Sequence, residues 1–310
     1  YDGKLIKTES NERKYIDGLK DNKILLYAGT KYHLASWYYR SKIDYLFIEE
    51  ASQFSLADLI SLGGIAKNIV LVGDQQQLGQ PTQGSHPNLS GNSVLEYLLE
   101  GKDTVPADMG IFLTRTYRMH PNINSFISEN FYENKLLTNP QNQNRKIDFP
   151  KNFFINNQGI HTILMNHEDC QQTSEQEFKK IDEIIKKLIG KNFTDVDKKV
   201  RPLKIQDFLI VAPYNAQVNF LLARLPEGTR CGTIDRFQGQ EAPITIISMT
   251  SSDLESLPRN KSFFFNSNRL NVAISRAQCL SIILINPKLI DSPPKTHEEF
   301  KLMNNFQKLL

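Results

Sequence analysis

The sequence is poor in cysteine. Only three of its 310 residues are cysteine, and Cys170, Cys231 and Cys279 lie far apart. An odd and scattered set argues against a disulfide framework and indicates a reducing compartment. No group of cysteine and histidine residues has the spacing of metal ligands, so a structural zinc site is not expected.

Long apolar runs are also lacking. The longest ones have the length of a strand rather than of a membrane-spanning helix, and the first residues contain neither the basic nor the apolar region of a signal peptide. The sequence therefore predicts a soluble intracellular protein with no membrane partner. It would lie in the cytoplasm, or in the nucleus if the source is a eukaryote.

Neither sign of charge dominates. Lys and Arg total 37 and Asp and Glu total 34, which gives a net charge of +3. This balance permits a nucleic-acid partner without requiring one. The chain is longer than one ordinary hydrophobic core, so we expect two domains, each large enough to bury a core of its own.

The apolar residues fall into strand-length runs that alternate with helical patterns. These runs are continuous rather than alternating, which is typical of parallel strands covered on both faces. The predicted fold class is therefore α/β. The runs cover residues 23–28, 45–48, 69–72, 208–212, 244–249 and 280–285.

A helix is predicted over residues 174–188. Ser174 and Glu177 have the spacing of a capping box, and the apolar residues that follow share one face of a helix. The lysines between them are expected to form its solvated face. The apolar stripe consists of Phe178, Ile181, Ile185 and Leu188.

Residues 139–158 are rich in Asn, Gln, Pro and Lys, which predicts a loop region with irregular structure. We place the end of the first domain upstream of it, near Phe112 and Leu113, where a strand is expected to lead into the stretch TRTYRMHP. The polar loop region then belongs to the second domain.

Two adjacent carboxylates, Glu49 and Glu50, follow the apolar run that ends at Ile48. Buried charges would be costly there, but the carboxyl end of a parallel strand is where open α/β sheets bind their ligands. Two acids in this place can hold the water shell of Mg²⁺ and orient an attacking water. Two solvated acids in a surface loop remain the alternative.

A second apolar run, residues 69–72, ends in Gly73 and Asp74, and glutamines follow. A glycine at a strand end lets the backbone approach a ligand closely, and a glutamine just beyond can sense a terminal phosphate by hydrogen bonding. A common strand-to-loop turn would have the same residues.

Six short segments, taken in order, carry a resemblance to a known family. The set EEASQ, GDQQQLGQP, TYRMHP, APYNAQ, GTIDRFQGQE and NRLNVAISRAQ resembles the superfamily 1 helicases, in particular the B subgroup that includes the nonsense-mediated decay helicase. The resemblance runs from about residue 23 to residue 287. It implies two RecA-like domains with parallel sheets: residues 1–113, incomplete at the N-terminus, and residues 114–310.

The resemblance implies an ATP site that needs Mg²⁺. Glu49 matches the acid that serves the metal, and Glu50 matches the acid that serves the hydrolytic water. Gln77 matches the glutamine that reads the γ-phosphate. Arg118 and Arg276 match the two arginines that the second domain brings to that phosphate, where they neutralise charge in the transition state.

Further residues would complete the nucleotide site by resemblance. Tyr117 matches the aromatic residue that packs on adenine, although a core tyrosine would fit the same position. Gly239 and Glu241 match residues at the ribose and phosphates. Asp235 and Gln238 belong to the same segment and are alternatively connected with the nucleic-acid track.

The resemblance also implies contacts with single-stranded DNA or RNA, through the backbone and through stacking on aromatic rings. The candidates are Thr30, Pro213, Tyr214, Asn215 and Thr233. Each of them is equally well explained as an ordinary loop or helix-cap residue.

Three departures from the family pattern stand out. Glu49 takes the place of an Asp, Thr116 takes the place of a Gln, and no G-x-x-x-x-G-K-[ST] phosphate loop occurs in the sequence. In the family that loop precedes the segments found here. We therefore expect it upstream, in the same or a companion chain, and expect the 310 residues alone to hydrolyse ATP poorly.

The implied function is the C-terminal motor portion of an ATP-dependent helicase or translocase that moves 5′ to 3′ on a single strand, with ATP between two RecA-like domains. A nucleic-acid-binding scaffold that has lost hydrolysis is the alternative. The retained Gln77, Arg118, Glu241 and Arg276 favour the motor, because a scaffold has no physical need for paired γ-phosphate arginines.

Overall fold

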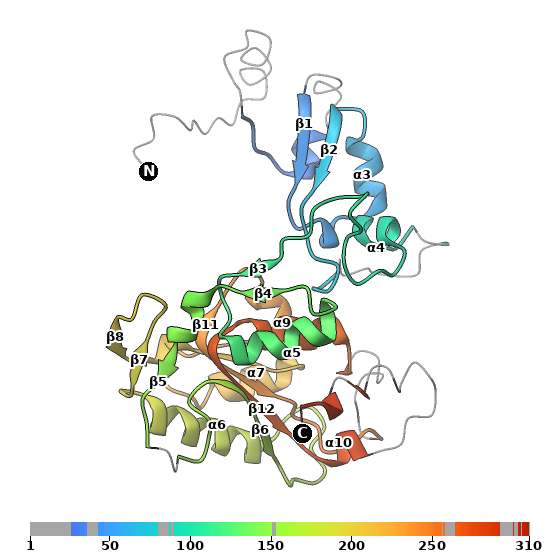
Figure 1. The fold of residues 1–310 in the computed structure, drawn as a ribbon. Helices are drawn as coiled ribbons and strands as arrows, with labels where there is room; N and C mark the ends of the chain where they lie inside the picture. The colour runs from blue at the N-terminus through green and yellow to red at the C-terminus, as the bar shows by residue number, and fades with distance from the viewer. Residues whose placement is uncertain are drawn as a thin grey trace. The chain divides into compact units, whose positions relative to one another are not determined.

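The computed structural model describes residues 26–35, 43–79, 87, 90–150, 153–255, 257, 264–291, 300, 303–304 and 306–309. Contacts within the chain divide it into two units (Figure 1). Unit 1 comprises residues 1–75 and 79–102, and unit 2 comprises residues 76–78 and 103–310.

Unit 1 contains two parallel strands, β1 (Ile43–Ile48) and β2 (Ala66–Leu71), paired from Ile43↔Ala66 to Ile48↔Leu71. Serine side chains cap its two longer helices: Ser55 accepts from Asp58 N–H, and Ser93 forms a full capping box with Glu96. Both serines thereby satisfy amide donors that a helix start leaves unpaired. Its helical elements are α2 (Lys31–Leu34), η2 (Ala51–Gln53), α3 (Leu56–Leu62) and α4 (Val94–Leu99).

The predicted buried strand at β1 exists, but only one of its faces is buried. Leu46 and Ile48 are buried, whereas Tyr45 and Phe47 are 59% and 66% exposed. Successive side chains of a strand point to opposite faces, so the exposed pair lies on one face of the β1–β2 ribbon. The run expected at residues 23–28 is not a strand where it is described: residues 26–28 are irregular, and 23–25 lie outside the described residues.

Unit 2 is built on a five-stranded sheet in which every neighbouring pair is parallel, in the order β10-β9-β11-β12-β6. The α/β prediction is thus confirmed, and three of the predicted runs are central strands. The edge strand β6 was not predicted, because His161 and Thr162 interrupt its apolar character. The strands are β6 (Gly159–Leu164), β9 (Phe208–Val211), β10 (Arg230–Gly232), β11 (Ala242–Ser248) and β12 (Ala277–Ile285).

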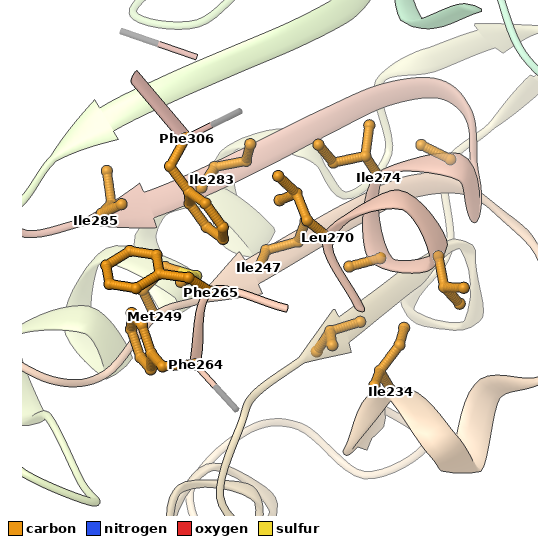
Figure 2. Packing of buried hydrophobic residues seen from close by; sticks show 14 of the residues in the cluster. Ile234, Ile247, Met249, Phe264, Phe265, Leu270, Ile274, Ile283, Ile285 and Phe306 are labelled. Atoms are coloured by element: carbon orange, nitrogen blue, oxygen red, sulfur yellow. The ribbon is translucent and has the colours of Figure 1, made fainter. Parts of the chain in front are cut away.

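Helices cover both faces of this sheet, and the strands supply two separate cores by alternation. In β11, Ile247 belongs to one core, with helices α5 (Pro121–Phe131) and α9 (Ser267–Ser275). Ile246 belongs to the other core, with α6 (Glu175–Leu188) and α7 (Asn215–Leu222). Figure 2 shows the first core, where rings of Phe264, Phe265 and Phe306 pack beside β11 and β12.

The helix predicted over residues 174–188 is confirmed, and only half of its predicted capping box forms. The hydroxyl of Ser174 accepts from Glu177 N–H at 3.2 Å, as expected. The carboxylate of Glu177 does not return to the N-cap, because its side chain is fully buried and hydrogen-bonded elsewhere. The lysines of α6 do face solvent, in exposed pairs with acids one turn away.

Irregular and short elements occupy the region between α5 and β6, as the composition of residues 139–158 predicts. It contains η3 (Pro140–Asn144) and β5 (Lys146–Ile147), which pairs antiparallel with β7 (Asn192–Thr194). No strand forms at Phe112 and Leu113; the short strand β3 (Arg115–Thr116) begins just beyond and pairs with β4 (Leu137–Thr138). The remaining elements are β8 (Val200–Pro202), η4 (Ile205–Asp207), η5 (Ile234–Phe237) and α10 (Lys288–Asp291).

The three cysteines are free, as their scattered positions predict. Burial raises the pKa of the Cys231 thiol to about 12, so this residue is an unreactive part of the core. In the part of the chain that the structure describes, no helix is both long and apolar enough to cross a membrane.

Candidate functional site

The two predicted acids lie where the sequence places them. Glu49 and Glu50 follow the carboxyl end of β1 directly, and both are exposed, so no charge is buried. Glu50 has a φ of 54°, which turns the chain sharply into η2. Among the described residues no group of three or more His, Cys, Asp or Glu could hold a metal. One carboxylate still fits Mg²⁺, which keeps most of its waters.

Gly73, at the end of β2, serves the protein's own packing. A Cβ at this position would lie 2.8 Å from the amide nitrogen of Ala51 and 2.9 Å from Cδ1 of Leu95. Ala51 N–H also donates to Val72 O at 2.9 Å, which ties the ends of the two strands together. Close packing within unit 1, by the backbone of Ala51 and the side chain of Leu95, is therefore one reason for a glycine here, and the approach to a ligand stays a prediction.

Gln76 and Gln77, which belong to unit 2, are held by helix α9 of the same unit and by the residue after it. Asn271 donates to Gln76 O at 2.8 Å, and Asn268 donates to Gln77 O at 2.7 Å. Arg276, which caps the end of α9, donates from Nη2 to Oε1 of Gln77 at 3.4 Å. The structure thus brings together two of the residues predicted to act on the γ-phosphate.

Arg118, the other predicted arginine, forms an ion pair with Glu241. Its Nε lies 2.7 Å from Oε2 of Glu241, and its Nη1 donates to Ser275 O at 3.3 Å. Gln278 donates to the second oxygen of Glu241 at 2.6 Å. Desolvation alone would raise the pKa of Glu241, but the hydrogen bonds and charges of Arg118 and its neighbours outweigh it, so the pKa lies below its ordinary value.

These side chains gather at the amino edge of the five-stranded sheet. Glu241 directly precedes β11 and Arg276 directly precedes β12, and parallel strands begin at the same edge. Arg118 joins them through its bonds to Glu241 and Ser275. We call Gln77, Arg118, Glu241 and Arg276 the arginine cluster.

Two further nucleotide candidates flank the arginine cluster. Tyr117 is 68% exposed, so it is not the core tyrosine of the alternative interpretation, and its ring is accessible to a ligand. Gly239 has a φ of +69°, which favours glycine, in the turn between η5 and β11. No atom lies within 4 Å of the Cβ position at Gly239, so this turn borders open space.

Most nucleic-acid candidates gather at the opposite, carboxyl edge of the sheet. Pro213, Tyr214 and Asn215 follow the end of β9, and Thr233 follows the end of β10. Thr233 is the N-cap residue of η5. In unit 1, Thr30 caps α2 by accepting from His33 N–H at 3.4 Å.

Tyr214 does not offer a stacking surface. Its side chain is 5% exposed and packs in the core beside α9. A base could not reach its ring in this conformation, so the stacking expected for it is not supported. Asn215 next to it is exposed at the start of α7.

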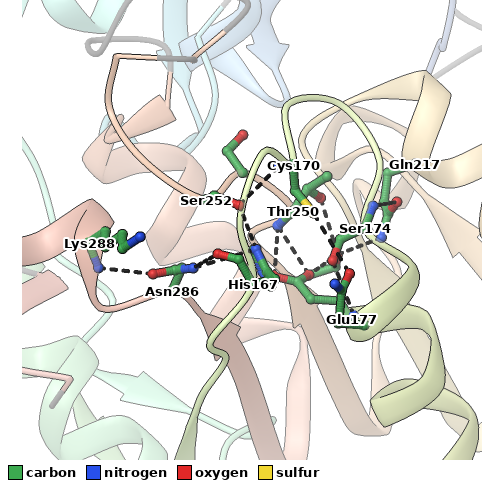
Figure 3. Close-up of polar contacts among 12 residues, drawn as sticks. His167, Cys170, Ser174, Glu177, Gln217, Thr250, Ser252, Asn286 and Lys288 are labelled. Atoms are coloured by element: carbon green, nitrogen blue, oxygen red, sulfur yellow. Dashed lines mark hydrogen bonds and ion pairs between the residues drawn. The ribbon is translucent and has the colours of Figure 1, made fainter.

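A buried polar network at the same edge was not predicted (Figure 3). The carboxylate of Glu177 accepts from Thr250 N–H at 3.0 Å, from the Ser248 hydroxyl, and from His167 Nε2 at 3.2 Å. The other ring nitrogen of His167 lies 2.8 Å from the Ser252 hydroxyl. All five side chains are buried. The sequence did not reveal these contacts of Glu177, because its capping-box spacing from Ser174 already accounts for a glutamate at this position.

Arg145 is the second residue that sequence reasoning missed. It follows η3 in the polar loop region, yet only 6% of it is exposed. Its Nη1 donates to Tyr117 O at 3.3 Å and also to Arg118 O. Nothing in a lone arginine among Asn, Gln and Lys residues distinguishes it from a solvated one.

Comparison with known proteins agrees with the family resemblance. A family model described as an AAA domain matches residues 91–288, which is more than half of the chain. Proteins named as helicases match both units. The chain belongs to the superfamily 1 helicases.

Individual helicases are distant relatives. The DNA replication ATP-dependent helicase/nuclease of Gallus gallus is 30% identical over 267 residues, which cover 82% of this chain and 24% of that protein. A homolog of regulator of nonsense transcripts 1 from Drosophila melanogaster is 27% identical over 274 residues, covering 81% of this chain and 21% of its own.

The chain spans only 15% to 36% of the length of eight such curated relatives. Among solved structures, the arterivirus nonstructural protein 10 helicase aligns with 78% of this chain and 38% of its own, at 15% identity and a TM-score of 0.38. That similarity is too distant for individual helicase residues to be compared.

Proposed function

We propose that the chain is the C-terminal motor portion of an ATP-dependent helicase or translocase that moves 5′ to 3′ on single-stranded nucleic acid. Residues 1–113 would belong to the first RecA-like domain and residues 114–310 to the second. The observation that carries the proposal is the arginine cluster. It brings two arginines and a glutamine together with one carboxylate at one edge of the sheet, and two guanidinium groups in one place suit a strong anion such as a phosphate.

The residues fit the chemistry of phosphoryl transfer. Arg118 and Arg276 would bind the γ-phosphate and neutralise the charge that develops on it, a role worth roughly 10³ to 10⁵ in turnover in comparable enzymes. Gln77 would sense that phosphate, and Glu50 would orient the attacking water. Glu49 would hold Mg²⁺ through its waters; when bound, the ion neutralises phosphate charge.

A bound nucleotide would have to replace the ion pair between Arg118 and Glu241. Arg118 is partly exposed and its partner is a carboxylate, so a phosphate competes with Glu241 for the same guanidinium. Glu241 would then be released toward the ribose, the role that the family resemblance assigns to it. Tyr117 beside this pair has an exposed ring for the adenine.

We propose further that the phosphate loop is supplied by a segment outside these 310 residues. The sequence holds no such loop, and Tyr45 and Phe47 expose one face of the β1–β2 ribbon. An exposed apolar sheet face of this kind is typical of a face that another segment covers. The 310 residues alone would then hydrolyse ATP poorly.

The nucleic-acid strand would lie along the carboxyl edge of unit 2. Pro213, Asn215 and Thr233 gather there and have partly or fully exposed side chains. They would contact the phosphate backbone, because the ring of Tyr214 is not available for stacking. Contacts of this kind do not choose between DNA and RNA; a contact with the 2′-hydroxyl would.

ATP turnover is the decisive measurement. It should be recorded with and without single-stranded DNA or RNA, for the 310 residues and for the longest native polypeptide that contains them. We expect strand-stimulated turnover only in the longer protein, reduced at least 10³-fold by Arg276→Ala. Arg224→Ala, which removes an exposed arginine at the end of α7, is the control and should leave turnover unchanged.

The scaffold hypothesis makes the opposite forecast for the same experiment. A longer protein that binds single strands but shows no turnover, with or without Arg276, would replace the motor by a strand-binding module. Strand-independent turnover that survives Arg276→Ala would contradict both.

A further inference from the structure

Four successive backbone carbonyls of the segment 116–119 are held by two side chains from one turn. Asn142 Nδ2 donates to Thr116 O at 3.4 Å and to Met119 O at 3.0 Å. Arg145 donates to the two carbonyls between them, Tyr117 O and Arg118 O. Both side chains come from η3 and the residue that follows it. We call Asn142 and Arg145 the carbonyl clamp.

The clamp is buried although its parts are polar. Asn142 is 1% exposed and Arg145 is 6% exposed. Taking a guanidinium out of water is costly unless it is paired or hydrogen-bonded. Among the described residues no carboxylate lies within ion-pair distance of Arg145, and carbonyl oxygens satisfy it instead. The guanidinium and the carbonyls satisfy one another, so an apolar side chain in place of Arg145 would leave the carbonyls of Tyr117 and Arg118 without this donor.

The charge of Arg145 also acts on the arginine cluster. Burial lowers the pKa of Arg145, and the nearby charge of Glu241 opposes that shift. Arg145 also helps to lower the pKa of Glu241. The side chain therefore acts on the same carboxylate that pairs with Arg118, from the backbone side of the segment.

The shape of the guanidinium explains why the residue is an arginine. A planar fork with donors on both terminal nitrogens can serve two neighbouring carbonyls at once, whereas a lysine ammonium is a point charge on a flexible stem. Two fixed carbonyls define the orientation of the peptide planes at residues 117 and 118. That orientation in turn sets the directions in which the Tyr117 and Arg118 side chains leave the backbone.

We propose that Arg145, with Asn142, is a positioning residue for Tyr117 and Arg118. It fixes the segment so that the Arg118 guanidinium lies ready at the phosphate and the Tyr117 ring at the base. The inference rests on the proposed function for the ligand, while the clamp itself can be tested on the 310 residues alone.

Limited proteolysis of the 310 residues with trypsin tests the clamp directly. Cleavage after Arg118 requires the segment to leave its place, so its rate reports local opening. In Arg145→Lys and Arg145→Gln, loss of charged hydrogen bonds should speed this cleavage about 10- to 100-fold. Cleavage after Lys198 or Lys199, in the exposed turn before β8, is the internal reference and should stay unchanged.

Arg224→Lys is the matched control, because Arg224 also donates to a backbone carbonyl, Phe220 O, but lies on an exposed helix end. It should leave the cleavage after Arg118 unchanged. An unaltered rate in both Arg145 variants would overturn the inference. Equal acceleration at every tryptic site would overturn it too, because Arg145 would then support the whole fold and not this segment.

Kinetics of the longer polypeptide test the consequence for ATP. A misplaced Arg118 should lower kcat at least tenfold in Arg145→Lys with little change in KM, because the arginine acts mainly in the transition state. A raised KM with an unchanged kcat would contradict positioning of Arg118. If the unaltered longer protein shows no turnover, the proposed function fails, and the cleavage rates alone decide whether the clamp exists.

Discussion

The two edges of the five-stranded sheet in unit 2 differ in how far their charged side chains are exposed to solvent. At the amino edge, Arg118 and Glu241 pair at 2.7 Å with 30% and 42% of their side chains exposed. At the carboxyl edge, Glu177 and His167 pair at 3.2 Å with no exposure at all. A ligand can therefore reach Arg118 and take the place of Glu241, whereas no ligand can reach Glu177 or His167.

Access to solvent distinguishes a structural polar cluster from a candidate functional site. The buried network has the residue types of a hydrolytic triad, a Ser, a His and a Glu in hydrogen-bond sequence, but Ser252 is 1% exposed and no substrate can reach it. Its donors and acceptors satisfy one another, as buried polar groups must. In the arginine cluster Arg276 is 3% exposed, but the Arg118–Glu241 pair is partly exposed and a ligand can reach it, so this cluster is the candidate site.

The largest expected effect concerns the carboxyl edge. Glu177→Ala removes the acceptor of Thr250 N–H, Ser248 and His167 and leaves these groups buried and unsatisfied. We expect it to lower the free energy of unfolding by about 3–5 kcal/mol. Urea unfolding, together with hydrogen exchange at the end of β11, measures the loss.

Glu175→Ala is the matched control for that experiment. Glu175 starts the same helix, is half exposed and lies 3.9 Å from Lys179. Its removal should change the free energy of unfolding by less than about 1 kcal/mol. Similar losses in the two variants would erase the distinction between a buried network and a surface pair.

A smaller, pH-dependent effect is expected from His120 at the amino edge. His120 is buried, and its ring Nδ1 caps α5 by accepting from Asn122 N–H at 3.1 Å. Its backbone N–H donates to Gln278 O. Burial, with a further contribution from the charge of Arg145, lowers the pKa of His120. The unfolded chain therefore binds the proton more readily than the folded one.

The stability from this depressed pKa is complete above the unfolded value of about 6.5 and is lost as the pH falls toward the folded value. His120→Asn keeps a good cap for α5. Below pH 6.5 it should reduce the slope of thermal stability against pH, by at most about 1.4 kcal/mol per pH unit. His161 titrates with the same sign and stays in the variant, so part of the slope remains. An unchanged slope would refute the assignment.

The smallest effect belongs to the exposed pair. Glu241→Gln keeps the shape of the side chain and an acceptor for Arg118 but removes the charge. Because both partners are partly exposed, we expect a loss of less than about 1 kcal/mol in the free energy of unfolding at neutral pH. A loss as large as that of Glu177→Ala would show that the arginine cluster is a structural feature of the fold.

Several parts of the fold followed from the sequence. Continuous apolar runs predicted the central strands β9, β11 and β12, and the stripe on residues 174–188 predicted α6. The edge strand β6 and the exposed face of β1 did not follow, because local pattern does not say which strand lies at an edge or which face is covered. Family membership was also readable, since six short segments in a fixed order are specific even where each is weak.

The positions of the site residues required the tertiary structure. Arg118 and Glu241 are 123 residues apart, and Gln77 and Arg276 are 199 apart. Motif order suggested that they share a ligand. Only the tertiary structure shows that they lie together: Glu241 and Arg276 precede neighbouring parallel strands, and Arg118 and Gln77 are hydrogen-bonded to them.

The sequence by itself determined the α/β class, the central strands and the chemistry of the six family segments, because periodicity and residue type act locally along the chain. Only the tertiary structure decided that Tyr214 is core, that Glu177 leaves its cap for a buried network, and that Arg145 clamps the backbone of Tyr117 and Arg118. These three findings depend on burial and on hydrogen-bond partners that are distant in sequence. The type of a single residue determines neither its burial nor its distant partners.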